Sequence, residues 1–64
     1  MKLKTSDMIK AKLLDAQENV RDFQEYSGKV DDPEVDKAFK KFAEESAMQA
    51  RRLEQLLEKY DEMR

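Results

Sequence analysis

The 64-residue chain contains no cysteine, no histidine and no tryptophan, and only one glycine and one proline. Without cysteine it can form no disulfide, thiolate metal site or thiol nucleophile. Without histidine it lacks the commonest transition-metal ligand and the usual general base near neutral pH. Because Ser6, Ser27 and Ser46 have no such base to activate them, we expect no nucleophilic catalysis and no enzyme. Because the usual metal ligands are missing, we also expect no cofactor. A core of this size is marginal, so we expect a second chain to support it.

Long apolar runs and an excess of positive charge are missing as well. No stretch approaches the ~18 apolar residues of a membrane span, and no apolar segment follows the N-terminal lysines as it would in a secretory signal. We therefore expect a protein that does not bind membranes, and the lack of cysteine fits a cytoplasmic location. The net charge of -2 also argues against a nucleic-acid partner. The chain is instead 44% charged and 39% hydrophobic, which is typical of long amphipathic helices.

Turn signals occur between Ser27 and Pro33. Gly28 suits the residue after a helix, in a left-handed conformation. Asp32 suits the N-cap of the next helix and Pro33 its first position. We predict one domain over residues 1–64, with a helix at about 6–27, a loop at 28–32 and a helix at about 33–62. A loop this short makes the pair an antiparallel hairpin.

The apolar residues of the second predicted helix alternate by three and four positions, as in antiparallel bundles. They are Val35, Phe39, Phe42, Leu53, Leu56, Tyr60 and Met63. The same count passes through Ser46 and Gln49, which predicts a polar pair on the face that must be buried. The matching residues of the first helix are Ile9, Leu13, Ala16, Val20 and Phe23. Folding the chain at the loop places Ala16 near the level of Ser46.

Further apolar residues flank both stripes, namely Leu14, Ala38, Ala43, Ala50 and Leu57. Two helices cannot cover stripes of this width. We therefore predict a homodimer, an all-α four-helix bundle with two-fold symmetry. Its predicted core contains Val20, Phe23, Phe39, Phe42, Leu53 and Leu56.

One segment carries a family pattern. It reads Asp31-Asp32-Pro33-Glu34-Val35, then Ala38-Phe39 and Phe42-Ala43-Glu44-Glu45, with Ala50 and Leu53 following. It resembles the second helix of rubrerythrin-like, ferritin-like half-bundles, whose di-iron centre is held by a Glu from one helix and a Glu-x-x-His from the next. In register, the resemblance places those ligands on Ala16, Ser46 and Gln49. Because these residues are neutral, the resemblance implies the ferritin-like bundle without its metal.

Three functions fit this pattern. The first is a structural or interaction protein, in which Ser46 and Gln49 form a buried polar layer, hydrogen-bonded across the two-fold axis, that fixes register. The alternative is a carboxylate-based metal-binding or redox protein of the ferritin-like class. Its candidate ligands are Glu18, Glu25, Glu44 and Glu45. The third is a regulatory hairpin that docks on a larger helical protein. Its candidate anchors are Met8, Leu14 and Tyr26.

Overall fold

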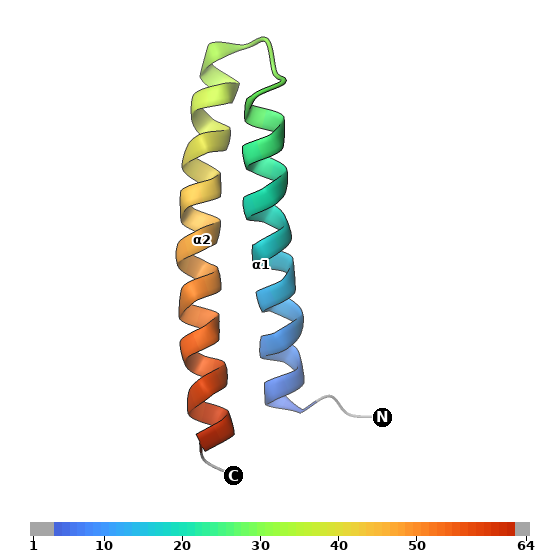
Figure 1. Cartoon of the computed structure of the whole chain (residues 1–64), viewed down its shortest axis with the longest axis vertical. Helices are drawn as coiled ribbons and strands as arrows, with labels where there is room; N and C mark the ends of the chain where they lie inside the picture. The colour runs from blue at the N-terminus through green and yellow to red at the C-terminus, as the bar shows by residue number, and fades with distance from the viewer. Residues whose placement is uncertain (1–3, 63–64) are drawn as a thin grey trace.

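The computed structural model describes residues 4–62, with side chains as far as Tyr60. Two helices, α1 (Thr5–Ser27) and α2 (Pro33–Glu62), run antiparallel and side by side (Figure 1). The hairpin is thin, with extents of 48 × 24 × 13 Å. The all-α hairpin predicted from the sequence is confirmed. Within the described range, neither helix has an apolar stretch long enough to cross a membrane.

Asp32 forms the N-cap of α2. Its Oδ1 accepts hydrogen bonds from the backbone N–H of Glu34 at 2.8 Å and of Val35 at 3.4 Å. The Asp32 carbonyl oxygen accepts the first helical bond, from the Asp36 N–H at 2.9 Å. Pro33 needs no such partner, because it has no N–H to donate. The cap and the proline together set where α2 begins.

The end of α1 differs from the expectation. Gly28 has φ −77° and ψ −8°, which is right-handed rather than left-handed backbone. The N–H groups of Lys29 and Val30 both donate to the Tyr26 carbonyl, at 2.9 and 3.0 Å. The terminal turn therefore continues the right-handed geometry of the helix and pairs its carbonyl without a left-handed residue. The prediction of a left-handed Gly28 was wrong.

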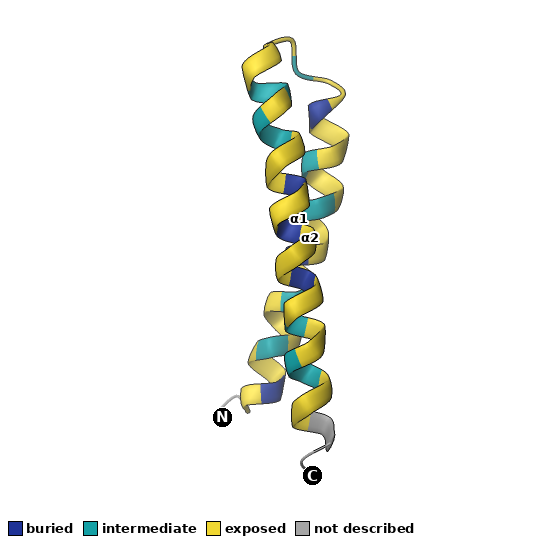
Figure 2. Cartoon of the chain, turned by 90° about the vertical axis from the view of Figure 1, so that its left-hand side faces the viewer, coloured by how far each residue is buried: buried dark blue, intermediate teal, exposed yellow. Residues whose placement is uncertain are grey.

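The interior stripe of α1 follows the predicted spacing. Its buried and half-buried residues are Ser6, Ile9, Leu13, Ala16, Val20, Phe23 and Ser27. On α2, three and four positions again alternate, through buried Ala43, Ser46 and Ala50 and half-buried Phe39, Leu53 and Leu57. Figure 2 shows the buried positions as short dark segments on ribbons that are otherwise mostly exposed.

Most of the predicted stripe of α2 is buried or half-buried, but the stripe differs from the observed one at several positions. The covered residues of the prediction are Val35, Phe39, Ser46, Leu53 and Leu56. Phe42, Gln49 and Tyr60 are exposed in the hairpin, whereas Ala43 and Ala50 are buried. Met63, also on the predicted stripe, lies outside the described residues. The physical reason is the size of the side chains, because small ones such as Ala43 and Ala50 let two helices approach closely. The edge of the apolar stripe that carries the larger side chains then lies outside the contact between the helices.

An aromatic cluster near the loop fixes the register of the helices. The ring of Phe23 lies 5.4 Å from the rings of both Phe39 and Phe42, tilted by 58° and 59°. Such tilted pairs contribute about 0.5–1.5 kcal/mol beyond burial alone. Ala16 lies seven residues before Phe23, and Ser46 lies seven residues after Phe39. Because the helices are antiparallel and rise by the same distance per residue, Ala16 and Ser46 lie at the same level. Both are buried, with 4% and 6% of their surface exposed.

Candidate interaction site

The hairpin buries few large side chains. Its most buried residues are Ala16, Ala43, Ala50, Ser6, Ser27 and Ser46, and no large side chain of the described residues is fully buried. The accessible surface is 5488 Å². A compact monomer of the same mass would expose only about 4,300 Å². The excess of roughly 1,200 Å² is more than the ~800 Å² that one partner contributes to a standard protein interface.

One long side of the hairpin exposes large apolar side chains. Phe42 and Tyr60 of α2 are 42% and 41% exposed, and Met8 and Tyr26 of α1 are exposed as well. In each helix the two residues are 18 positions apart, which is five full turns, so they point the same way. Along α2, Gln49 and Leu56 continue from Phe42 at intervals of seven. We call this set the aromatic face: Met8, Tyr26, Phe42, Gln49, Leu56 and Tyr60.

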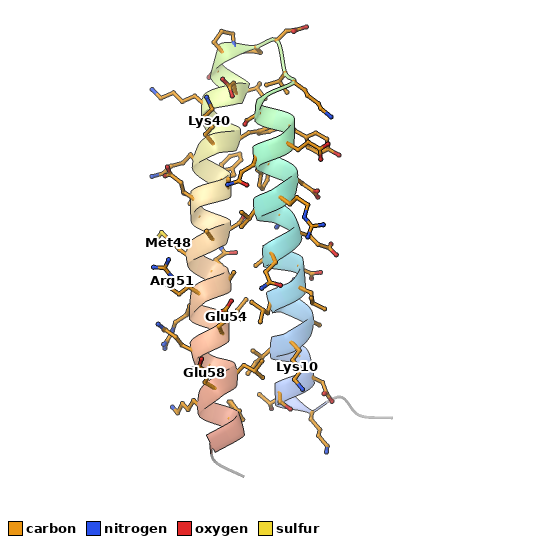
Figure 3. All side chains as sticks on the ribbon, viewed as in Figure 1. Lys10, Lys40, Met48, Arg51, Glu54 and Glu58 are labelled. Atoms are coloured by element: carbon orange, nitrogen blue, oxygen red, sulfur yellow. The ribbon has the colours of Figure 1, made fainter. Side chains whose placement is uncertain are left out.

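The other long side carries a shallow groove with smaller side chains. It is lined by Gln17, Val20 and Gln24 of α1 and by Ala43, Ala47 and Ala50 of α2. Charged residues border it, namely Lys40, Glu44, Arg51 and Glu54, of which Figure 3 labels Lys40, Arg51 and Glu54. We call this set of lining residues the alanine groove.

The aromatic face and the alanine groove lie on opposite sides of the hairpin. Met8 is nine residues from Gln17, or two and a half turns, so the two project from opposite sides of α1. Phe42 is five residues before Ala47, which places it about 140° further round α2. The large apolar side chains of both helices therefore share the side away from the groove.

Two other exposed apolar side chains belong to neither face. Leu14 is 61% exposed and Met48 is 70% exposed. Met48 projects away from α1 in Figure 3. Single exposed apolar residues are common on protein surfaces and indicate no binding site. Substitutions at these residues can therefore be compared with substitutions on the aromatic face.

The three residues of the predicted polar layer occupy different environments. Ala16 and Ser46 are buried between the helices, as their spacing predicted. Gln49 is exposed in a single chain and lies at the middle of the aromatic face. The hairpin alone therefore brings together two of the three. Burial of Gln49 stays a prediction about an assembly of chains.

The predicted dimer-core residues are also incompletely covered in one chain. Val20, Phe23, Phe39, Leu53 and Leu56 are half-buried. Phe42 is exposed on the side that Phe23 and Phe39 do not cover. Whether a second chain covers these residues is a separate prediction.

The carboxylates are dispersed rather than gathered. In the part of the chain that the structure describes, no three acidic side chains come together in an arrangement that could hold a metal ion. Of the four candidate ligands, Glu25 pairs with Lys29 instead, its Oε1 accepting a hydrogen bond from Nζ at 3.1 Å. This arrangement gives no support to the carboxylate-based metal site.

Ion pairs among the described residues are local. They are Lys12–Asp15, Lys29–Glu25 and Lys40–Asp36, each joining residues three or four positions apart. Exposed pairs of this kind contribute at most about 1 kcal/mol. They support single helices and do not hold α1 to α2, so the pairing of the helices depends on the apolar stripe and the aromatic cluster.

The sequence placed Gln49 on the same buried stripe as Ser46, and it named Phe42, Met8 and Tyr26 without showing that they share one face. Two signals were available. The first is the set of small residues at Ala43 and Ala50, spaced by seven, which marks a line of close helix approach. The second is the 18-residue interval that separates Met8 from Tyr26 and also Phe42 from Tyr60.

The chain was also compared with known proteins. No family model, curated protein or solved structure matches it. The resemblance to rubrerythrin-like proteins therefore stays a prediction that depends on the residues quoted for it.

Proposed function

We propose that this protein is a non-catalytic structural or interaction module, a helical hairpin that works as a homodimer in a four-helix bundle. The uncovered aromatic face carries the proposal. It leaves Phe42, Tyr60, Met8 and Tyr26 in water on one side of a chain whose interior consists largely of small residues. Burying such a face against a second copy gains about 25 cal/mol for each Å² of apolar surface removed from water.

The residues at the centre of the proposed bundle suit a structural role. Ala16, Ser46 and Gln49 occupy the positions that the rubrerythrin resemblance assigns to metal ligands, and all three are neutral. A buried Ser or Gln can hydrogen-bond and fix register, but neither offers the anionic ligands that two metal cations need. We therefore propose a ferritin-like architecture with no metal cofactor and no catalytic residue.

The proposal extends to location and partners. Lack of cysteine is compatible with a reducing cytoplasm, where we place the protein. The principal partner is a second copy of the chain. A larger helical protein that covers the same aromatic face is the other arrangement, and the test below separates the two.

Light scattering on the purified, untagged chain tests the proposal. We expect a helical species with twice the 7.6 kDa chain mass at micromolar concentration. A folded monomer at that concentration would rule out the homodimer. A monomer that folds only when another helical protein is added would assign the face to that partner instead.

A further inference from the structure

We propose that the two chains of the dimer pair α2 against α2 in antiparallel orientation, with Gln49 on the two-fold axis. This inference rests on the homodimer proposed above and adds the arrangement of its interface. It follows from the spacing of side chains along α2, from the charges beside them and from the position of Gln49 on the exposed face.

The positions of α2 on the aromatic face, together with Ala38 one turn before Phe42, are symmetric about Gln49, and we call them the strip of α2. Phe42 and Leu56 each lie seven residues from it, and Ala38 and Tyr60 each lie eleven residues from it. In an antiparallel pair centred on Gln49, a residue before the centre meets the residue equally far after it on the other chain. Phe42 then packs on the partner's Leu56.

The second matched pair complements the first in size. Ala38 faces the partner's Tyr60, so that the smallest side chain of the strip lies opposite a large ring. Alternation of large and small residues across facing helices lets the layers interdigitate without voids. Two copies of one α2 surface therefore fit each other, as a two-fold interface requires.

α1 supplies a weaker contact on the same side. Between Met8 and Tyr26, its strip passes through Lys12 and Asn19, both exposed and polar. Lys12 is already paired within α1, its Nζ donating to Asp15 at 3.2 Å. The strip of α2 is interrupted only by Gln49. This contrast makes α2 the helix that carries the interface.

Charges at the outer flank of the strip favour the antiparallel direction. Glu45 lies four residues before Gln49 and Arg52 three residues after it, and both are exposed. Neither belongs to an ion pair among the described residues of its own chain, and the Arg52 Nη1 donates only to the neutral amide of Gln55, at 3.3 Å. Antiparallel pairing brings Glu45 beside the partner's Arg52 on each side of the axis. Parallel pairing in register would instead oppose like charges, which is unfavourable across an interface.

Glutamine suits the position on the axis. Its amide has two N–H donors and one carbonyl acceptor. Two symmetry-related amides can therefore each donate to the other's oxygen, so that neither is buried without a partner. An unpaired buried amide would be costly, which makes the position sensitive to the side chain that occupies it.

A charge placed on the axis tests the arrangement. Gln49→Glu puts two carboxylates against each other only if Gln49 meets itself. We expect the dimer dissociation constant to rise at least about tenfold, because like charges opposed in an interface are strongly unfavourable. Gln17→Glu is the matched control, since it makes the same change in charge at an exposed residue of the alanine groove, on the opposite side of the hairpin. Equal dissociation constants for the two variants would overturn the arrangement.

Distances between spin labels test it independently, because any cysteine introduced into this chain is unique. Lys41→Cys, Met48→Cys and Gln55→Cys lie on one exposed strip at intervals of seven. Antiparallel pairing about Gln49 predicts axial separations between symmetry-related labels of about 24, 3 and 18 Å, from a rise of 1.5 Å per residue. A parallel pair in register would give the same separation at all three sites. If the separations have no minimum near Met48, the antiparallel arrangement is wrong but the dimer is not. If no intermolecular distance is measured at any of the three sites, the dimer itself is ruled out.

Discussion

The aromatic face and the alanine groove are two sides of one hairpin, and they differ in what they leave to solvent. The groove exposes small side chains between charged borders, so contact with water costs little there. The aromatic face exposes Phe42, Tyr60, Met8 and Tyr26 instead. The chain buries its small residues most deeply between its helices and leaves these four large ones exposed. This division is expected when α2 must pack against two neighbours.

The largest difference in stability should come from shortening one exposed apolar side chain on the aromatic face and another outside it. We expect Phe42→Ala to lower the unfolding free energy by about 2–4 kcal/mol, because Phe23 packs on the ring and a second chain would cover it in the proposed dimer. Met48→Ala, equally apolar but outside the face, should change it by less than about 0.5 kcal/mol. Denaturant unfolding at one protein concentration measures both. Similar losses for the two would remove the distinction between the face and the rest of the surface.

A substitution at the N-cap of α2, outside the aromatic face and the alanine groove, gives a smaller loss of stability with which the loss for Phe42→Ala can be compared. Asp32→Ala removes the N-cap that binds the Glu34 and Val35 N–H groups and should cost about 1 kcal/mol. Asp31→Ala is the control, since its neighbour Asp32 provides the cap. Thermal unfolding followed by circular dichroism measures both variants. If Asp31→Ala were the more costly of the two, the assignment of the cap would be wrong.

The loop offers a change of opposite sign. Gly28 is right-handed, and a Cβ added there would lie 3.7 Å from the Glu25 carbonyl oxygen, an ordinary contact. Gly28→Ala should therefore raise the unfolding free energy by about 0.4–1 kcal/mol, by restricting the unfolded chain. Neither face is altered, so the dimer contacts should not change. A lower midpoint of unfolding would show that the position needs a conformation that only glycine adopts.

The smallest change in stability is expected at the polar layer. Ser46→Ala combined with Gln49→Leu replaces one buried polar residue and the polar centre of the aromatic face by apolar ones. The melting temperature should stay the same or rise, while the chain should form a wider range of oligomers, because buried polar groups fix register at some cost in stability. Melting curves and light scattering on the same samples measure both properties. A large loss of stability would count against the layer as a device for register.

These contrasts also show what the sequence could predict. Asp32 and Pro33 set the start of α2 through one carboxylate and one missing N–H, so the hairpin was predictable from local chemistry. The stripe of α1 was predictable because the count by three and four from Ile9 to Phe23 passes through apolar residues at every step, whereas a count from Met8 or Leu14 soon meets charged or polar residues. The orientation of α2 was not, since Phe42 and Ala43 are adjacent apolar residues about 100° apart on the helix. Either can face α1, and the choice depends on how closely the helices approach.

The concentration dependence of thermal unfolding tests the central claim most directly. If the aromatic face is covered by a second chain, unfolding separates two molecules and the melting temperature must rise with protein concentration. We expect a clear increase across a hundredfold range for the unmodified chain and little folded protein at the dilute end. A cooperative transition at the same temperature throughout that range would show that the hairpin is stable alone and would contradict the account.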